Sequence, residues 1–234
     1  MKMISNEINS LNKFEVKLLL VLFFFVSFAE IFAEFYNETG FVYILKPFII
    51  PILTLIYWKT SKKRNVYFLI SMFFALLANL FFISKDFSSI VLASTFFLLH
   101  RALVIYLVLK NVKIKRFLPV FLGSIPFLTV FAYLTFITMN ELGEGFLIYI
   151  IQVLFMSFLG GFALSNYMIE ENKMNYWLLL NSILFAVIQF IIVLKLFYVS
   201  ILIFQPISMI LYVFAQYALY KFMILAENKE LLLD

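Results

Sequence analysis

Five polar side chains interrupt long apolar stretches of this sequence, and they are its first candidates for chemistry. His100 is the sole histidine and could transfer a proton near neutral pH. Glu30 could act as an acid or a base in an apolar setting. Lys46 could hold a phosphate, which ammonium groups commonly bind. Asn79 and Gln189 offer amides, which donate and accept hydrogen bonds but do not titrate in the useful pH range.

The composition indicates what must position these residues. The chain has 234 residues, of which 65% are hydrophobic and 13% charged, whereas soluble domains have about 25% charged residues. We therefore expect an all-α, polytopic membrane protein. Without cysteine, and with one histidine, disulfides, thiolate catalysis and a metal site are not expected, and no cofactor is predicted.

Apolar runs of the length needed to cross a bilayer predict eight transmembrane helices. We expect a short cytoplasmic segment at 1–15, one transmembrane domain at 16–225 and a cytoplasmic tail at 226–234. The predicted spans are 16–35, 41–58, 66–83, 90–109, 117–138, 145–169, 176–194 and 199–225.

The loop charges predict the orientation. Fourteen lysines and arginines fall on the side that carries both termini, and two, Lys85 and Lys195, fall on the other. Basic loops stay in the cytoplasm, so both termini are expected there, in a multi-pass protein of a bacterial inner membrane. The net charge of +5 is explained by this asymmetry, and no nucleic-acid partner is predicted.

With this orientation, polar residues of four helices fall at one depth. Glu30, Lys46, Asn79 and Gln189 each lie four or five residues from the outer end of a predicted span, or roughly 6–8 Å below the outer interface. This layer predicts a pocket that opens toward the outer leaflet.

Other polar residues of the spans fall deeper. His100 and Arg101 lie roughly 16 Å in, with Tyr212 at a similar depth and Gln216 deeper still. Polar groups in a bilayer are costly and are functional candidates for that reason.

A structural interpretation stands beside each functional one. Glu30 and Lys46 could be a neutralising ion pair, Glu34 and Arg101 could extend their charges to water or headgroups, and His100 could be a helix-packing residue. Amides at membrane depth often form hydrogen bonds between helices. Those open to this interpretation are Asn79, Gln152, Asn166, Asn181 and Gln216.

Four patches in order along the chain carry a family resemblance. They are LKPF at 45–48, LLAN at 76–79 followed by FFLLH at 96–100, the segment from ILF to QF at 183–190, and the segment from MILY to AQYAL at 209–219. Together they resemble the YhhN family of integral membrane proteins, which includes the lysoplasmalogenases.

The resemblance implies hydrolysis of the vinyl ether bond of a lysoplasmalogen to an aldehyde and a glycerophospho-alcohol. It would place two catalytic aspartates at the positions of Asn79 and Gln189, where an amide cannot exchange a proton. His100 and Glu30 are then the candidates to replace them. Lys46, Tyr212 and Gln216 are the candidate ligand-binding residues, with Lys46 on the phosphate of a lysolipid.

Three hypotheses follow. The first is a protein that acts on or binds a lysolipid-type amphiphile, with vinyl ether hydrolysis as the implied reaction. The second is a non-catalytic protein that binds or transports a lipid or small amphiphile. The third is a structural membrane protein in which the polar layer serves helix packing. The expected partners are a lipid or lysolipid and the bilayer.

Overall fold

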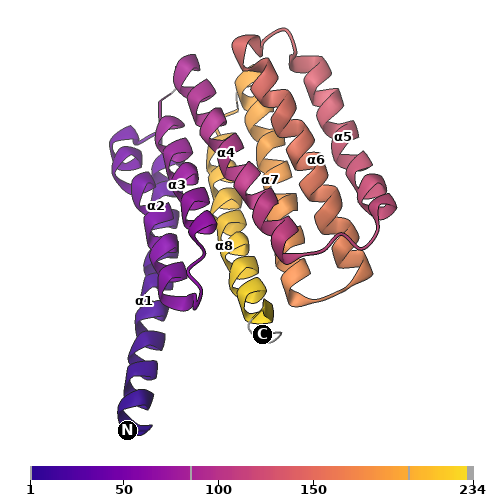
Figure 1. Cartoon of the computed structure of the whole chain (residues 1–234). Helices are drawn as coiled ribbons and strands as arrows, with labels where there is room; N and C mark the ends of the chain where they lie inside the picture. The colour runs from indigo at the N-terminus through magenta and orange to yellow at the C-terminus, as the bar shows by residue number, and fades with distance from the viewer. Residues whose placement is uncertain (1, 85, 200, 231–234) are drawn as a thin grey trace.

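The computed structural model describes residues 2–84, 86–199 and 201–230. Within these residues the chain forms eight α-helices, a single 3₁₀ turn (η1, Gly143–Gly145) and no strand (Figure 1). The all-helical fold predicted from composition is confirmed. The helices are α1 (Lys2–Phe35), α2 (Thr39–Thr60), α3 (Val66–Phe81), α4 (Phe87–Asn111), α5 (Phe117–Thr138), α6 (Phe146–Ile169), α7 (Lys173–Phe197) and α8 (Phe204–Glu230).

The helices pack as four consecutive pairs, α1 with α2, α3 with α4, α5 with α6, and α7 with α8. Six of them close a ring in the order α2, α3, α4, α6, α7 and α8, while α1 packs outside against α2 and α8, and α5 outside against α6 and α7. The start of α1 and the end of α8 lie at the same end of the bundle (Figure 1). We call this the inner end, and the opposite end, with the turns after α1, α3, α5 and α7, the outer end.

Seven of the described helices are long and apolar enough to cross a membrane. Large apolar side chains such as Phe25, Phe117 and Leu147 are about two-thirds exposed or more, as expected for a surface that faces lipid. The remaining helix, α3, has 16 residues and rises about 24 Å. The multi-pass membrane architecture is thereby supported, with α3 as its short member.

Three predicted boundaries, in α1 and α8, differ from the structure by about five residues or more. α1 begins at Lys2 instead of near residue 16, so the polar segment at 1–15 is helical from Lys2 on. α8 begins at Phe204 instead of near 199 and continues to Glu230, past the predicted end at Leu225. The charged residues near position 15 and after position 225 led to the predicted start of α1 and the predicted end of α8, but charged residues do not end a helix. At α8, Ala226 and Glu227 are buried, so the predicted tail begins inside the bundle.

Polar side chains fix the starts of three helices. Asn65 accepts hydrogen bonds from the backbone of Tyr67 and Phe68 at α3, and Asn172 accepts one from Asn175 at α7. Such caps satisfy the free N–H groups of a first turn.

At α4 the cap is Asp86, whose side chain accepts from the backbone of Ser89. Hydrogen bonds from the Ser84 hydroxyl and from Ser89 lower the pKa of Asp86 to about 2. The carboxylate therefore stays ionised, and keeps its capping role, at any physiological pH.

Glycines join the peripheral helix α5 to the ring. A Cβ added to Gly161 of α6 would lie 2.1 Å from Ser124 Oγ and 2.5 Å from Ser124 N of α5. On the α5 side, a Cβ added to Gly123 would lie 2.9 Å from the Gly161 carbonyl oxygen. The backbones touch here, a close approach that small residues permit between membrane helices. α6, which contributes to the site described next, is braced in this way from outside.

Candidate functional site

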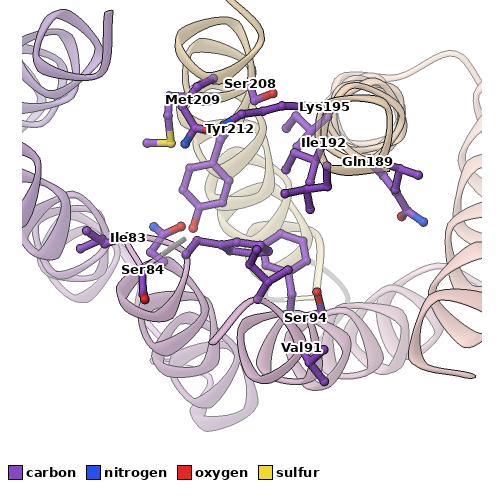
Figure 2. A pocket seen from close by; sticks show the side chains of 18 of the residues that line it. Ile83, Ser84, Val91, Ser94, Gln189, Ile192, Lys195, Ser208, Met209 and Tyr212 are labelled. Atoms are coloured by element: carbon purple, nitrogen blue, oxygen red, sulfur yellow. Dashed lines mark hydrogen bonds between the residues drawn. The ribbon is translucent and has the colours of Figure 1, made fainter. Parts of the chain in front are cut away.

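A cavity of about 500 Å³ lies inside the six-helix ring and reaches the outer end of the bundle. Its walls come from α2, α3, α4, α6, α7 and α8, with Glu34 of α1 and residues of the outer turns at its rim. Figure 2 shows side chains from the α3–α4 turn, α4, α7 and α8 around this one space. The polar residues of separate helices therefore meet at a real cavity.

The structure brings four of the seven predicted site residues to this cavity and leaves three out. Lys46, Asn79, Gln189 and Tyr212 line it. The other three, Glu30, His100 and Gln216, are buried but are not among its lining residues.

The polar residues predicted to share one depth span a wider range of depths in the structure. Asn79 lies two residues from the outer end of α3, whereas Gln189 lies eight residues from that of α7. These offsets correspond to about 3 Å and 12 Å along the helix axes. The predicted helix ends were too far from the observed ones to give the depths correctly.

Lys46 forms a buried ion pair with two carboxylates of α1. Its Nζ lies 2.7 Å from Glu34 Oε1 and 3.5 Å from Glu30 Oε1, and the Lys46 and Glu30 side chains are 2% and 0% exposed. The ion-pair interpretation of Glu30 and Lys46 is therefore what the geometry shows. Glu34, predicted to extend to water or headgroups, instead turns inward and lines the cavity.

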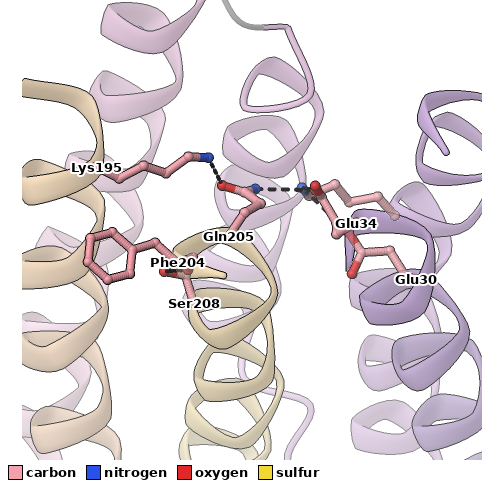
Figure 3. A network of polar contacts seen from close by, with 7 residues as sticks. Glu30, Glu34, Lys195, Phe204, Gln205 and Ser208 are labelled. Carbon is pink, nitrogen blue, oxygen red and sulfur yellow. Dashed lines mark hydrogen bonds and ion pairs between the residues drawn. The ribbon is translucent and has the colours of Figure 1, made fainter. Parts of the chain in front are cut away.

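From Glu34 a chain of polar contacts crosses the rim of the cavity (Figure 3). Gln205 of α8 donates through Nε2 to Glu34 Oε1 at 3.2 Å. Lys195 of α7 donates to Gln205 Oε1. These contacts connect α1, α8 and α7 at the outer end, and they place both signs of charge at the cavity.

Arg101 of α4 is a cavity residue that was not among the predicted site residues. Its side chain is 4% exposed and lines the cavity. Nη1 donates to Gln189 Oε1 at 2.7 Å and to Gln152 Oε1 at 3.4 Å. Extension to water was expected, but Arg101 lies fourteen residues inside α4, or about 21 Å from its outer end. That depth was the available signal, because it exceeds the reach of the side chain.

One buried donor at the cavity has no partner within the described residues. Gln189 Nε2 makes no hydrogen bond there, whereas the Tyr212 hydroxyl lies beside the side-chain amides of Asn79 and Gln216. An unpaired buried polar group costs about 1–3 kcal/mol, and such groups are rare in folded proteins. Gln189 Nε2 is therefore a buried donor for which the described residues provide no acceptor.

His100 lies behind the cavity wall. Its Nδ1 lies 2.8 Å from the Ser71 carbonyl oxygen of α3, and its ring packs against Phe97 and Phe185. This is the geometry of the helix-packing interpretation. Gln216 is likewise enclosed, and its amide lies beside the Tyr212 hydroxyl. Asn181 donates to the Ala215 carbonyl at 2.8 Å and so joins α7 to α8, as the packing interpretation predicts.

A second buried polar cluster lies at the inner end, around Glu227 of α8. One carboxylate oxygen accepts from the Tyr57 hydroxyl and the other from Ser61 Oγ at 2.7 Å. In turn, Tyr57 Oη accepts from the Asn65 backbone at 2.8 Å, and Ser61 Oγ accepts from the Arg64 backbone at 2.7 Å. Every oxygen named here has a partner, and the cluster joins the α2–α3 turn to α8.

Comparison with known proteins decides the family. The model of the YhhN family matches residues 41–222, which is most of the chain. The chain belongs to the YhhN family. No curated protein and no solved structure matches it.

The YhhN match begins within α2 and ends within α8, so it includes every helix that closes the ring. Arg101, Gln152 and Gln189 lie inside the matched region, whereas α1, with Glu30 and Glu34, lies outside it. The ring and its cavity are thus the part of this protein that the family match covers.

Proposed function

We propose that this YhhN-family protein binds a lysolipid-type amphiphile in the cavity of its six-helix ring. The observation that carries the proposal is the division of the cavity into polar and apolar parts. Arg101, Gln152 and Gln189 form a polar group within it. On the same three helices, the lining residues nearer the outer end are mostly apolar. They include Ile90, Val91, Ile148, Ile192, Val193 and Leu196.

This division suits a ligand with one polar end and one apolar chain. The polar end would satisfy the buried donor of Gln189, and each methylene buried against the apolar wall adds about 0.8 kcal/mol. A volume of about 500 Å³ is in the range of small-molecule sites.

Binding of a lysophospholipid to the purified protein, measured by calorimetry in a mild detergent, tests the proposal. Ile192→Trp fills the cavity, since Ile192 lines it, and we expect affinity to fall by about tenfold or more. The matched control is Ile183→Trp on the same helix, where the side chain is 42% exposed and no change is expected. Equal affinities of the two variants would contradict the proposal.

Vinyl ether hydrolysis is a second candidate function, favoured by the position of Glu34. Asn79 and Gln189 cannot transfer protons, and His100 does not reach the cavity. The reaction needs a proton on the enol ether carbon, addition of water, and collapse of the hemiacetal to an aldehyde and a glycerophospho-alcohol. The Lys46–Glu34 pair provides a proton donor and an acceptor at the cavity.

Release of fatty aldehyde from a lysoplasmalogen between pH 5 and 8 tests this candidate. Glu34→Gln is expected to slow release by about 100-fold or more, the usual effect of losing a general acid or base. Binding without aldehyde release by the unaltered protein would exclude hydrolysis and leave the binding function in place.

A further inference from the structure

The charge of Arg101 has no carboxylate beside it. The ion pairs found in the described part of the chain join Lys46, Lys59 and Lys115 to glutamates, and none includes Arg101. Its polar contacts are two amide oxygens, which carry no net charge. Burying an uncompensated cation is costly. A ligand that brings a negative charge would remove this cost.

More than half of the guanidinium's N–H donors are left for such a ligand. A guanidinium has five N–H donors, and the contacts to Gln152 and Gln189 are both made by Nη1. Among the described residues, Nε and Nη2 make no hydrogen bond. A planar pair of free donors matches two oxygens of a phosphate.

The surroundings hold the guanidinium in place. Gln152 donates through Nε2 to the Ser94 carbonyl at 2.9 Å, which fixes the amide that Arg101 contacts. The rings of Phe97 and Phe185 lie 5.3 Å and 6.0 Å from the guanidinium carbon, within reach of a cation–π contact. A group fixed in this way loses little entropy when an anion binds.

Gln189 both orients Arg101 and adds a donor of its own. Its Oε1 accepts from Arg101 at 2.7 Å, while its Nε2 is buried without a partner in the described chain. The Gln189 side chain is 6% exposed and lines the cavity. An oxyanion placed against Arg101 would supply the acceptor that this nitrogen lacks.

Lys46, by contrast, is already neutralised. It shares one positive charge between Glu30 and Glu34, so an added phosphate would meet two carboxylates next to the ammonium. The phosphate assigned to Lys46 from the sequence is therefore better placed elsewhere.

We propose that Arg101, with Gln152 and Gln189, forms an anion site that binds the phosphate group of the ligand in the cavity. The proposal rests on the proposed function, since it assigns the polar end of the same amphiphile. It makes Arg101 the residue that selects phosphate-bearing amphiphiles over uncharged ones of equal chain length.

Two ligands with the same chain test the site, namely oleoyl lysophosphatidic acid, which carries a phosphate, and monoolein, which does not. Arg101→Gln is expected to weaken lysophosphatidic acid binding by about 30-fold, the loss of one charged bidentate contact, and to change monoolein binding by less than about threefold. Arg101→Lys, which keeps the charge but not the planar fork, should fall between the two. sn-Glycerol 3-phosphate and inorganic phosphate are tested as competitors.

Each outcome decides one of the two proposals. If Arg101→Gln weakens both lipids equally, or neither, the anion site is wrong while the cavity stands. If the unaltered protein binds neither lipid, the proposed function fails. If glycerol 3-phosphate competes as strongly as the lysolipid, the anion site is supported and its ligand is the free headgroup. Thermal unfolding without ligand shows that each variant is folded.

Discussion

The two buried polar clusters of this protein differ in whether the chain completes them. At the inner end, both oxygens of Glu227 accept from hydroxyls, and those hydroxyls accept from backbone N–H groups. At the cavity, no carboxylate of the described residues pairs with Arg101, and Gln189 Nε2 has no partner among them. The inner cluster contributes to stability by being satisfied. The buried charge at the cavity carries a cost that, under our proposal, a bound anion relieves.

The Lys46 ion pair stands between these cases. It borders the cavity, as Arg101 does, but Lys46 has two carboxylates of the chain within ion-pair distance. Burial and polarity alone therefore do not identify a site. The decisive property is a buried polar or charged group without a partner. Removing a group that has partners should lower the free energy of unfolding, whereas removing one that lacks them should leave it unchanged or raise it.

The largest loss of stability is expected for Lys46→Met. The substitution leaves Glu30 and Glu34 buried next to one another, and breaking a buried pair by removing one partner costs about 3–5 kcal/mol. The free energy of unfolding can be measured by denaturant titration in mixed micelles. Adding Glu30→Gln and Glu34→Gln to the same chain should restore most of the loss.

Lys59→Met is the matched control. Lys59 lies 2.8 Å from Glu15, with side chains 45% and 49% exposed, and exposed pairs contribute about 1 kcal/mol or less. If Lys46→Met lowers the free energy of unfolding no more than this control does, the Lys46 ion pair does not stabilise the protein. It could then not be placed between the two clusters.

A smaller loss is expected for Glu227→Leu at the inner end. The substitution deprives the Tyr57 and Ser61 hydroxyls of their acceptor, at a cost of about 2–4 kcal/mol for two buried groups. Affinity for a lysophospholipid, measured under native conditions, should not change.

Glu141→Leu, at an exposed position in the outer turn, is the control and should shift stability by less than about 0.5 kcal/mol. A Glu227 variant that stays as stable as this control, or that loses ligand affinity as Arg101→Gln does, would remove the contrast between the clusters.

For Arg101→Met the expected change in ligand-free stability is small and positive, about 0–1 kcal/mol, because an uncompensated buried charge is removed. The same variant should lose its response to ligand. Lysophospholipid at 100 times its Kd stabilises a binding protein by about 2.7 kcal/mol, and the variant should gain almost none of this. Thermal unfolding with and without the lipid measures both effects. A loss of 3 kcal/mol or more without ligand would instead make Arg101 a structural residue.

The smallest effect is expected at the surface pair of Lys115 and Glu170 on the inner side. A hydrogen bond and the positive charge of Lys115 lower the pKa of Glu170, and the two side chains are 47% and 43% exposed. Lys115→Ala should therefore cost less than about 1 kcal/mol.

The pH dependence of this small term has a definite sign. A lowered pKa gives stability that is present above the unfolded value near 4.3 and lost as the pH falls through the folded value. The unaltered protein and Lys115→Ala should thus differ at neutral pH and converge in acid. A difference that grows in acid would contradict the assignment.

Much of the fold was predictable because membrane-spanning helices consist of long apolar segments. The predicted span at 117–138 matches α5 at both ends, and the others match within a few residues except at α1 and α8. Those two helices continue through charged residues. The sequence does not show that a charged residue such as Glu227 is buried when its partner, here Tyr57, lies on another helix.

The site was harder to predict because the rotation of each helix decides it. His100 and Arg101 are neighbours in sequence, about 100° apart around α4. His100 faces Ser71 behind the wall, while Arg101 reaches Gln189 across the cavity. The unbroken apolar surroundings of α4 give no amphipathic pattern from which the rotation could be inferred. Neither depth nor residue type indicated which of these two adjacent residues faces the cavity.

The 16 residues of α3 have a consequence for the bilayer itself. The helix spans about 24 Å where the hydrocarbon core is about 30 Å thick. A short span is accommodated by local thinning of the membrane. At its inner end α3 follows the turn held by Glu227. The difference between the length of α3 and the thickness of the hydrocarbon core therefore falls at the outer end. There the turn after α3, with Ile83 and Ser84, borders the cavity. We therefore expect lipid headgroups to lie deeper near the opening, which would shorten the path from the leaflet to the cavity.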